Sequence, residues 1–511
     1  MKIAMVASEV VPFAKTGGLA DVAGALPLAL EYCGHEIIVI MPGYKCITDA
    51  KLKITRVSKD VTTSLIGKNI KVFFIENKDY FNRDGLYGDK NGDYRDNLER
   101  FAFFCRRALD LLKEINFSAD ILHLHDWQAS TVAAYLKNLY SGMSFYSRIS
   151  CVLTLHNIGY QGVFAKEAFP KLGFGWGLFD IEGFEFYNKV NLLKGGIVFA
   201  DFINTVSPTY AFEIQTKELG FGLDGLLRKR KSVFSGILNG VDYSVWDPNS
   251  DRFIRQNFSL ANLEGKALNK QDLQKISGLP QDKNIPVLGM VSRLAEQKGF
   301  DIFVQGLDEL CKMDVQLVIL GSGDLKYQEF LKEAAEKYPK VISLNLKFDD
   351  HLAHKIYAGS DIFLMPSKYE PCGLGQLISL HYGTIPLVFK TGGLADTISR
   401  HNGFIFSQYT QEELLKLINK ATLLFKNKNK SQLVKTNEQV KKMFVKTLMT
   451  PYSNTKSLPE NNFYNYINNI FYPGVVDAYG NLLWTAIVHC AMYYTPEQAG
   501  FLFAGLTKMR T

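Results

Sequence analysis

Short apolar runs rich in Val and Ile recur along most of the chain, and segments with helical periodicity separate them. The first series of runs begins with KIAMVA (2–7) and ends with DFINTV (201–206), and a second series starts at PVLGMVS (286–292). The runs are continuous rather than alternating, which is typical of strands buried on both faces and therefore of parallel sheets covered by helices. Residues 96–115 show the helical pattern most clearly. The apolar face of that segment consists of Phe101, Phe104, Ala108 and Leu111.

The length of the chain, 511 residues, exceeds what one hydrophobic core usually organises. Between residues 247 and 284 the apolar runs stop and the sequence is mostly polar. We therefore predict an α/β protein with two doubly wound, Rossmann-like domains, 1–250 and 251–425, that face one another across a cleft. Ligands of such sheets bind at the carboxyl ends of the strands.

The seven residues KTGGLAD occur twice, at 15–21 and at 390–396. We expect each copy to follow a strand, one through Ala14 and one through Phe389, and to open a helix. Paired glycines let backbone N–H groups approach a ligand without a Cβ in the way, and a helix start adds unpaired donors and a positive dipole. Two such turns in separate domains indicate one ligand in a shared cleft, with Lys15 as a point charge for phosphate.

Composition excludes several classes of protein. Lys+Arg 58 against Asp+Glu 51 gives a net charge of +7, too mild over this length to indicate a nucleic-acid partner. No window of about 18 uncharged apolar residues occurs, so we expect no membrane span and no membrane partner. The seven cysteines are scattered without a C-x-x-C pair, which favours reduced thiols in a cytoplasmic protein and no zinc module.

Two short patterns resemble metal sites and fail as such. Asp89, Asn91 and Asp93 have calcium-loop spacing. Tyr94, however, stands where that loop needs Gly, and Arg100 stands where it needs Glu. His123 and His125 lack a third ligand, so core and cleft roles are favoured for them. We therefore expect no metal and no other cofactor.

A series of longer motifs runs in order from the first residue to about residue 400. It includes KTGGLADVAGALP, LHLHDWQAS, LTLHNIGYQG, GILNGVDYSVWDP, SRLAEQKGFD, LGSGD and SKYEPCGLGQL. The series resembles the glycogen synthases of the bacterial and plant-starch type, which are retaining glycosyltransferases of the GT-B architecture. The resemblance implies transfer of glucose from ADP-glucose to the non-reducing 4-hydroxyl of an α-1,4-glucan such as glycogen.

The resemblance also implies the catalytic groups. Arg293 and Lys298, in SRLAEQKG, match positions that stabilise the diphosphate leaving group, where a charge-assisted contact is worth roughly 1.5–3 kcal/mol. Glu370, in YEPCGLGQ, matches the carboxylate that lies beside the donor glucose and favours positive charge at the anomeric carbon. His156 matches the residue whose backbone carbonyl faces that carbon and whose ring touches the sugar.

The remaining site residues fall into two sets. The ADP-glucose set is Lys15, Gly17, Gly18, Asn239, Gly321, Phe348, Cys372, Gly373, Leu374, Thr391 and Gly392. The acceptor and cleft set is Glu9, Asp21, Tyr87, Asp126 and Trp127, with Asn97 beside Tyr87. Phe348 falls where an aromatic ring stacks on adenine, although Tyr is more usual there. A nucleophilic Cys372 is disfavoured against a small buried residue, because no base lies near it in the sequence.

Two features leave alternatives open. The resemblance favours ADP-glucose as the donor. A transferase that uses UDP-glucose would differ only in the pocket for the base, so this alternative stays open. From about Phe425 the sequence departs from the family and ends in an atypical tail, residues 426–511. Either 463–471 or 482–494 is a candidate for a helix that crosses back to the first domain. Without such a helix, a catalytically weak glucan-binding protein of the same fold is the competing hypothesis.

Overall fold

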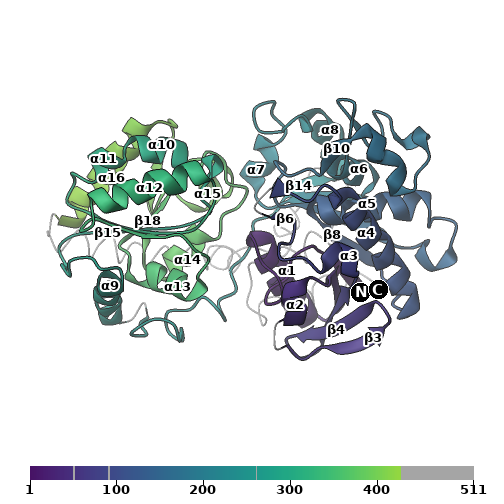
Figure 1. Ribbon diagram of the computed structural model, residues 1–511, viewed down its shortest axis with the longest axis horizontal. Helices are drawn as coiled ribbons and strands as arrows, with labels where there is room; N and C mark the ends of the chain where they lie inside the picture. The colour runs from purple at the N-terminus through teal and green to yellow at the C-terminus, as the bar shows by residue number, and fades with distance from the viewer. Residues whose placement is uncertain (50–51, 90–91, 260–261, 427–511) are drawn as a thin grey trace, which may run out of the picture. The chain divides into compact units, whose positions relative to one another are not determined.

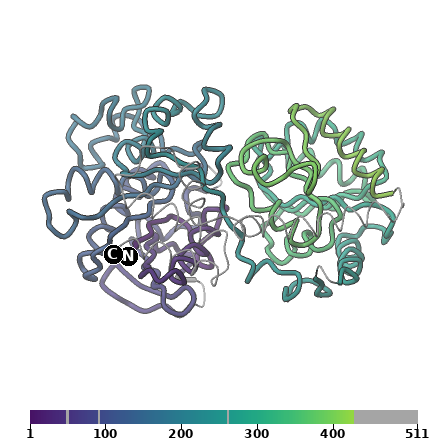
Figure 2. Tube along the Cα trace, turned by 180° about the vertical axis from the view of Figure 1, so that it is seen from behind, coloured from purple at the N-terminus to yellow at the C-terminus, as the bar shows by residue number. Residues whose placement is uncertain are grey.

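The computed structural model describes residues 1–49, 52–89, 92–259 and 262–426. These residues divide into two compact units, the first ending at Gly240 and the second beginning at Val241. Each unit is a sheet covered by helices, and the chain can be followed through each of them in Figures 1 and 2.

The first unit contains a nine-stranded sheet in the order β14-β13-β9-β8-β1-β2-β5-β4-β3. Neighbours from β14 to β5 are parallel, and β4 and β3 extend the sheet antiparallel. The strands are β1 (Lys2–Val6), β2 (Glu36–Pro42), β3 (Thr55–Ser58), β4 (Val61–Ile66), β5 (Ile70–Ile75), β8 (Ile121–His125), β9 (Ser150–Leu155), β13 (Phe202–Thr205) and β14 (Phe234–Gly236). The strand order reverses at β1. After β1 the chain adds β2 and β5 on one side of it, and later it adds β8 and β9 on the other side.

Eight α-helices belong to the described part of the first unit. They are α1 (Gly18–Tyr32), α2 (Lys45–Asp49), α3 (Lys78–Phe81), α4 (Asn97–Glu114), α5 (Asp126–Asn138), α6 (Leu192–Phe199), α7 (Pro208–Glu213) and α8 (Asp224–Lys229). Helices α4 and α6 both pack against α5, and the predicted apolar face of α4 is buried. Small antiparallel elements complete the unit: β6 (Gly88–Asp89) with β7 (Gly92–Asp93), and β10 (Val163–Ala165) and β11 (Glu185–Phe186) on either side of β12 (Lys189–Asn191).

The second unit contains a six-stranded parallel sheet in the order β17-β16-β15-β18-β19-β20. Its strands are β15 (Val287–Val291), β16 (Gln316–Leu320), β17 (Ile342–Asn345), β18 (Ile362–Met365), β19 (Ile385–Phe389) and β20 (Phe404–Phe406). Numbered within the unit this is the order 3-2-1-4-5-6 of a dinucleotide-binding sheet, and it reverses between β15 and β18.

Helices cover both faces of the second sheet (Figure 1). Helices α10, α12 and α16 pack together, and α13 packs against α9 and α14. The helices are α9 (Glu264–Ile276), α10 (Phe300–Gln305), α11 (Leu307–Leu310), α12 (Leu325–Lys337), α13 (Asp350–Gly359), α14 (Gly375–His381), α15 (Gly392–Thr397) and α16 (Gln411–Lys426). Asp349 sets the start of α13, because its side chain accepts the N–H of Leu352 at 2.9 Å.

The structure confirms the predicted parallel sheets and corrects one strand. The expected strand through Ala14 is wrong: β1 ends at Val6, and Ala14 forms only an isolated bridge with Val10. The chain turns back there because the N–H of Ala14 donates to the carbonyl oxygen of Val10 at 3.0 Å. The expected strand before the second KTGGLAD copy is confirmed, since β19 ends at Phe389.

Two predictions about the organisation of the chain stay untested. The boundary at 250–251 stays a prediction. The candidate crossing helices, 463–471 and 482–494, lie outside the described residues. No helix within the described ranges has the length and apolar character needed to cross a membrane.

A buried polar cluster ties the start of the second unit to α13 and the end of α14. The carboxylate of Asp251 accepts the hydroxyl of Tyr382 at 2.6 Å and lies 2.7 Å from Nδ1 of His354. The ring of Trp246 stacks on His354 with centroids 4.0 Å apart. A buried carboxylate is stable only when donors satisfy it, so this cluster holds residues 246–251 on the helices.

We predict that Tyr382→Phe lowers the free energy of unfolding of the second unit by roughly 1.5–3 kcal/mol, because the buried carboxylate of Asp251 loses a donor. Urea denaturation followed by tryptophan fluorescence measures the loss. Tyr409→Phe is the matched control, since Tyr409 donates to the partly exposed Asp301 at 2.6 Å and water can replace it. Equal losses in the two variants would contradict the role of the buried cluster.

Candidate active site

In both units most of the predicted site residues follow the carboxyl ends of strands. Those beside the point where the strand order reverses lie in the loops after β1 and β8 in the first unit, and in the loops after β15 and β18 in the second. Tyr87, His156 and Thr391 follow β5, β9 and β19. Adjacent loops that leave a parallel sheet toward opposite faces leave a crevice between them, which is where ligands of such sheets bind.

The first KTGGLAD copy is held by Glu9. The carboxylate of Glu9 accepts the N–H of Thr16, the N–H of Gly17 at 3.2 Å and the hydroxyl of Thr16 at 2.6 Å. The amides of this turn therefore already bind an anionic group of the chain itself. Glu9 therefore shapes the turn, and its predicted place on the acceptor side stays a prediction.

The charged residues of that copy form an ion pair. Nζ of Lys15 lies 2.8 Å from Oδ1 of Asp21, across the start of α1 at Gly18. Both side chains remain about a quarter exposed, at 24% and 28%. Lys15 is therefore a cation at the carboxyl edge of the sheet that solvent reaches, and Asp21 is its partner.

Tyr87 connects this turn to the buried Arg100. Its hydroxyl donates to Oε1 of Glu9 at 2.6 Å, and burial raises the pKa of the phenol well above its ordinary value, so that it stays a neutral donor. The carbonyl oxygen of Tyr87 accepts the amide of Asn97 at 2.9 Å, and Nη1 of Arg100 donates to Oδ1 of Asn97 at 2.6 Å. This chain of hydrogen bonds holds the carboxylate of Glu9 in place.

His156, at the end of β9, is held by two consecutive residues at the junction of β8 and α5. Its backbone N–H donates to Oδ1 of Asp126 at 2.6 Å. Its ring nitrogen Nε2 lies 2.9 Å from Nδ1 of His125. Burial lowers the pKa of the His156 imidazole to about 3, so the ring is neutral at physiological pH.

Asp126 is half-buried and conformationally unusual. Its φ of 55° lies in the left-handed region that non-glycine residues rarely adopt. Burial raises the pKa of its carboxyl to about 7, and the N–H groups of His156 and Asn157 oppose that rise. The protein therefore carries backbone strain and a desolvated carboxyl at one residue, directly beside His156.

An aromatic groove of about 540 Å³ opens next to Trp127. Its lining residues are Asp93, Tyr94, Arg95, Asn97, Trp127, Gly159, Tyr160, Gln161, Gly162, Val163, Phe164 and Phe221. Trp127 packs edge-on against Phe101 with centroids 4.9 Å apart. Gly162 has a φ of +62°, and a Cβ there would lie 2.4 Å from the indole, so only glycine leaves room for Trp127. Aromatic faces beside polar groups are suited to sugar rings.

In the second unit, Lys298 and Glu370 form a largely buried ion pair across the point where the strand order reverses. Nζ of Lys298 lies 2.6 Å from Oε2 of Glu370, with side-chain exposures of 19% and 7%. The hydroxyl of Ser367 donates to the same oxygen at 3.0 Å. The two predicted residues are therefore in direct contact, and Ser367 is a third member that the sequence did not indicate.

Arg293 is placed by Gln297, which also joins the two loops. Nη2 of Arg293 donates to Oε1 of Gln297 at 3.3 Å. The backbone N–H of Lys368 donates to the carbonyl oxygen of Gln297 at 2.9 Å, and the Gln297 amide reaches the carbonyl oxygen of Tyr369 at 3.4 Å. The loop that carries Arg293 and Lys298 and the loop that carries Glu370 are thus one hydrogen-bonded layer.

The second KTGGLAD copy supports the Glu370 loop. The N–H of Gly393 donates to the carbonyl oxygens of Glu370 at 3.1 Å and Pro371 at 3.2 Å. A Cβ on Gly392 would lie 1.9 Å from the carbonyl oxygen of Glu370, and a Cβ on Gly393 2.1 Å from that of Cys372. The glycine pair is therefore required by close backbone packing, whereas the first copy binds a carboxylate.

The residues after Glu370 make a tight turn into α14. Gly373 has a φ of +73°, and the side-chain amide of Gln376 donates to the carbonyl oxygens of Cys372 at 3.0 Å and Gly373 at 2.9 Å. Leu374 is the N-cap of α14, and Cys372 is buried. Thr391, the N-cap of α15, is buried next to this turn.

Three predicted donor-site residues lie in other segments. Gly321, after β16, packs on the loop of Arg293, because a Cβ there would lie 1.8 Å from the carbonyl oxygen of Ser292. Phe348, after β17, is 67% exposed and therefore available for stacking. Asn239 is buried near the end of the first unit, and its Oδ1 has no hydrogen-bond partner within the described ranges.

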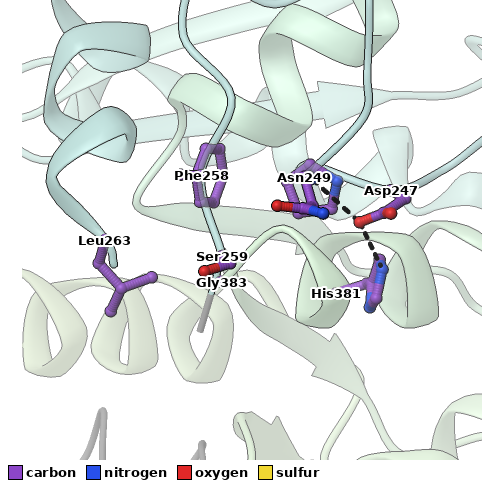
Figure 3. A pocket seen from close by; sticks show the side chains of 8 residues that line it. Asp247, Asn249, Phe258, Ser259, Leu263, His381 and Gly383 are labelled. Carbon is purple, nitrogen blue, oxygen red and sulfur yellow. Dashed lines mark hydrogen bonds and ion pairs between the residues drawn. The ribbon is translucent and has the colours of Figure 1, made fainter. Parts of the chain in front are cut away.

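A second hollow, of about 380 Å³, lies in the second unit (Figure 3). Its lining residues are Asp247, Pro248, Asn249, Phe258, Ser259, Leu263, His381 and Gly383. Oδ1 of Asp247 lies 3.6 Å from Nε2 of His381, which ends α14. The Glu370 loop precedes the other end of that helix, so this hollow lies at the amino edge of the sheet. None of the described residues that line it was predicted for the site.

Two family models match the chain, the Starch synthase catalytic domain over residues 2–229 and Glycosyl transferases group 1 over residues 269–440. The glycogen synthase of Geotalea uraniireducens (strain Rf4) is 47% identical over 447 residues, which cover 84% of this chain and 92% of that protein.

Solved structures agree with these matches. The catalytic domain of starch synthase IV from Arabidopsis thaliana, bound to ADP and acarbose, is 31% identical with a TM-score of 0.80, covering 86% of this chain and 94% of that one. The trehalose-6-phosphate synthase OtsA, at 15% identity and a TM-score of 0.53, covers 87% and 96% and shows the fold alone. The chain has the GT-B fold, with two Rossmann-like parallel sheets.

We predict that Asp126→Asn becomes progressively more stable than the unaltered protein as the pH rises toward 7. A carboxyl whose pKa is raised from its ordinary value to about 7 holds its proton in the folded state after the unfolded chain has lost it. The free energy of unfolding therefore falls by about 1.4 kcal/mol per unit of pH between the ordinary carboxyl pKa and the raised pKa of Asp126. The Asn variant does not titrate and does not lose this stability. Asn keeps an acceptor for the N–H of His156.

Urea denaturation at about pH 5 and about pH 8 measures this effect, and the stability difference should grow by roughly 2–3 kcal/mol. Asp110→Asn is the control, because Asp110 is an exposed carboxylate of the same unit. Parallel pH profiles for Asp126→Asn and the unaltered protein would contradict the desolvated carboxyl.

Proposed function

The chain belongs to the glycogen synthase family, and we propose that it transfers glucose from ADP-glucose to the non-reducing end of an α-1,4-glucan with retention of the anomeric configuration. It is a glycosyltransferase by its relatives and its family models. The observation that carries the finer proposal is the contact between Lys298 and Glu370 at the reversal point of the second sheet, with Arg293 in the same layer.

In the proposed reaction the bond between the anomeric carbon and the diphosphate breaks, its electron pair stays on the diphosphate, and charge develops on both fragments. The acceptor 4-hydroxyl oxygen then bonds to the anomeric carbon, and its proton passes to the departing diphosphate. Arg293 and Lys298 stabilise the negative charge on the diphosphate, and Glu370 favours positive charge on the sugar while accepting its hydroxyls. Because Lys298 already contacts Glu370, both charges are positioned before the donor binds. Preorganised charges of this kind need no reorganisation at the moment of reaction.

The first unit would supply the acceptor side. Its groove beside Trp127 offers aromatic faces and the side chains of Tyr94 and Arg95 to a glucan chain. Acarbose, an oligosaccharide, is bound to the related plant starch synthase IV catalytic domain, which supports a glucan as the acceptor. His156, held by Asp126 and His125 at the same edge, is the residue of this unit proposed to touch the donor sugar.

ADP-glucose is preferred to UDP-glucose as the donor on two grounds. ADP is the nucleotide bound to that plant relative. Phe348 is 67% exposed at the carboxyl edge of the second sheet, so its ring is available to a purine.

No disulfide joins the cysteines of the described residues, which supports the cytoplasm as the compartment.

Incorporation of radiolabelled glucose into glycogen tests the function, with ADP-glucose and UDP-glucose supplied side by side. We expect incorporation from ADP-glucose, much less from UDP-glucose, and a loss of at least roughly 100-fold in Glu370→Gln, which removes the charge but keeps the shape. Glu296→Gln is the matched control, since Glu296 pairs with Lys368 at the surface of the same two loops. Binding of glucan without incorporation would favour the competing glucan-binding protein.

We predict that Arg293→Ala and Lys298→Ala each weaken ADP binding roughly 10- to 100-fold and lower turnover, because each removes a charge-assisted contact to the diphosphate. Isothermal titration calorimetry with ADP measures the affinity. Lys368→Ala, which removes a surface ion pair of the same layer, should leave that affinity unchanged. Unchanged ADP affinity in both site variants would refute the assignment of the leaving-group cations.

A further inference from the structure

Two imidazole rings meet at the carboxyl edge of the first sheet, and the way they share a proton decides what His156 offers to a ligand. His125 ends β8, and its Nδ1 lies 2.9 Å from Nε2 of His156. Both rings are buried, with 0% and 8% of their surface exposed. With Nε2 bound to His125, Nδ1 is the ring nitrogen of His156 that is left for a ligand.

Only one proton can lie between the two rings, because both are neutral. Burial lowers the pKa of His125 well below its ordinary value and that of His156 to about 3. A neutral imidazole has one N–H donor and one bare acceptor nitrogen. Either Nδ1–H of His125 donates to Nε2 of His156, or Nε2–H of His156 donates to Nδ1 of His125.

The surroundings of His125 distinguish these two arrangements. Nε2 of His125 is fully buried and has no hydrogen-bond partner in the described part of the chain. If His156 were the donor, the proton of His125 would sit on this nitrogen as a buried N–H without an acceptor. Orphaned buried N–H groups are rarer than under-satisfied acceptors. The arrangement in which His125 donates leaves only a bare acceptor there, and it is therefore favoured.

We propose that His125 is a positioning residue that holds His156 as the Nδ1–H tautomer, so that His156 presents an N–H donor to a hydroxyl of the donor sugar. Asp126 fixes the backbone of the same residue through the N–H of His156, and His125 fixes its ring. The junction of β8 and α5 thus fixes both the backbone position and the tautomer of His156. The ligand part of this inference rests on the proposed function, whereas the tautomer does not.

The neighbouring His123 provides a matched control. Its Nε2 lies 2.6 Å from Oγ1 of Thr154, which donates its own proton to Oδ1 of Asn204 at 2.7 Å. His123 is therefore the donor to Thr154, and its proton position does not depend on His156. It is as buried as His125 and lies on the same strand, with ring centroids 4.1 Å apart.

Nitrogen NMR of the full chain labelled with ¹⁵N-histidine tests the tautomer directly. The chain has nine histidines, and His156→Gln assigns the signal of His156 by its disappearance. We expect a protonated Nδ1 and a bare Nε2 in the unaltered protein and in His123→Asn. His125→Leu should shift the tautomer population or mix the two forms. A protonated Nε2 of His156 in the unaltered protein would overturn the proposal.

Kinetics of glucose transfer tests the consequence. His125→Asn keeps an N–H near the position of Nδ1 and should retain most of the turnover, whereas His125→Leu should lower kcat roughly 3- to 10-fold, with ADP affinity unchanged. Equal losses in the two variants, or a loss of ADP affinity, would overturn the positioning role. If His156→Gln itself has normal kcat while NMR shows the Nδ1–H tautomer, the proposed contact with the sugar fails and the tautomer assignment stands.

Discussion

The reversal of strand order at the centre of each parallel sheet is the constraint on which the candidate site depends. At β1 and β8 in the first unit, and at β15 and β18 in the second, neighbouring strands send their loops toward opposite faces. Side chains from loops far apart in sequence meet in the crevice that this leaves. Lys298 and Glu370, 72 residues apart, are in contact for this reason.

The two KTGGLAD copies show that identical residues acquire their role from what packs against them. In the first copy the amides of Thr16 and Gly17 bind the carboxylate of Glu9. In the second copy Gly393 binds backbone carbonyl oxygens of the Glu370 loop. Glycine is needed in both, for a turn around an anionic group in one and for close backbone contact in the other.

Periodicity predicted the buried strands and the apolar face of α4, because both depend on local patterns of burial. The predicted apolar runs did not include β3, β4, β14 or β20. Strand β3 is exposed and polar, β4 is rich in Thr and Ser, and β14 and β20 have only three residues each. The resemblance to a family placed Arg293, Lys298 and Glu370, which tertiary structure brings together within the second unit. Ser367 and Gln297 could not be predicted, because neither side chain is chemically unusual. Ser367 matters through its hydrogen bond to Glu370 in the same turn, and Gln297 matters through its hydrogen bonds to the other loop.

The pairing of Lys298 with Glu370 also bears on which anions the empty protein retains. A sulfate ion must compete with a carboxylate that already lies 2.6 Å from the ammonium group, and it has no O–H to donate to Glu370 in return. A sugar diphosphate brings hydroxyls that can donate to Glu370 as its phosphates approach Lys298, so the carboxylate exchanges one partner for another. If the proposed donor binds at this pair, the pair disfavours anions that lack hydroxyl groups relative to sugar diphosphates.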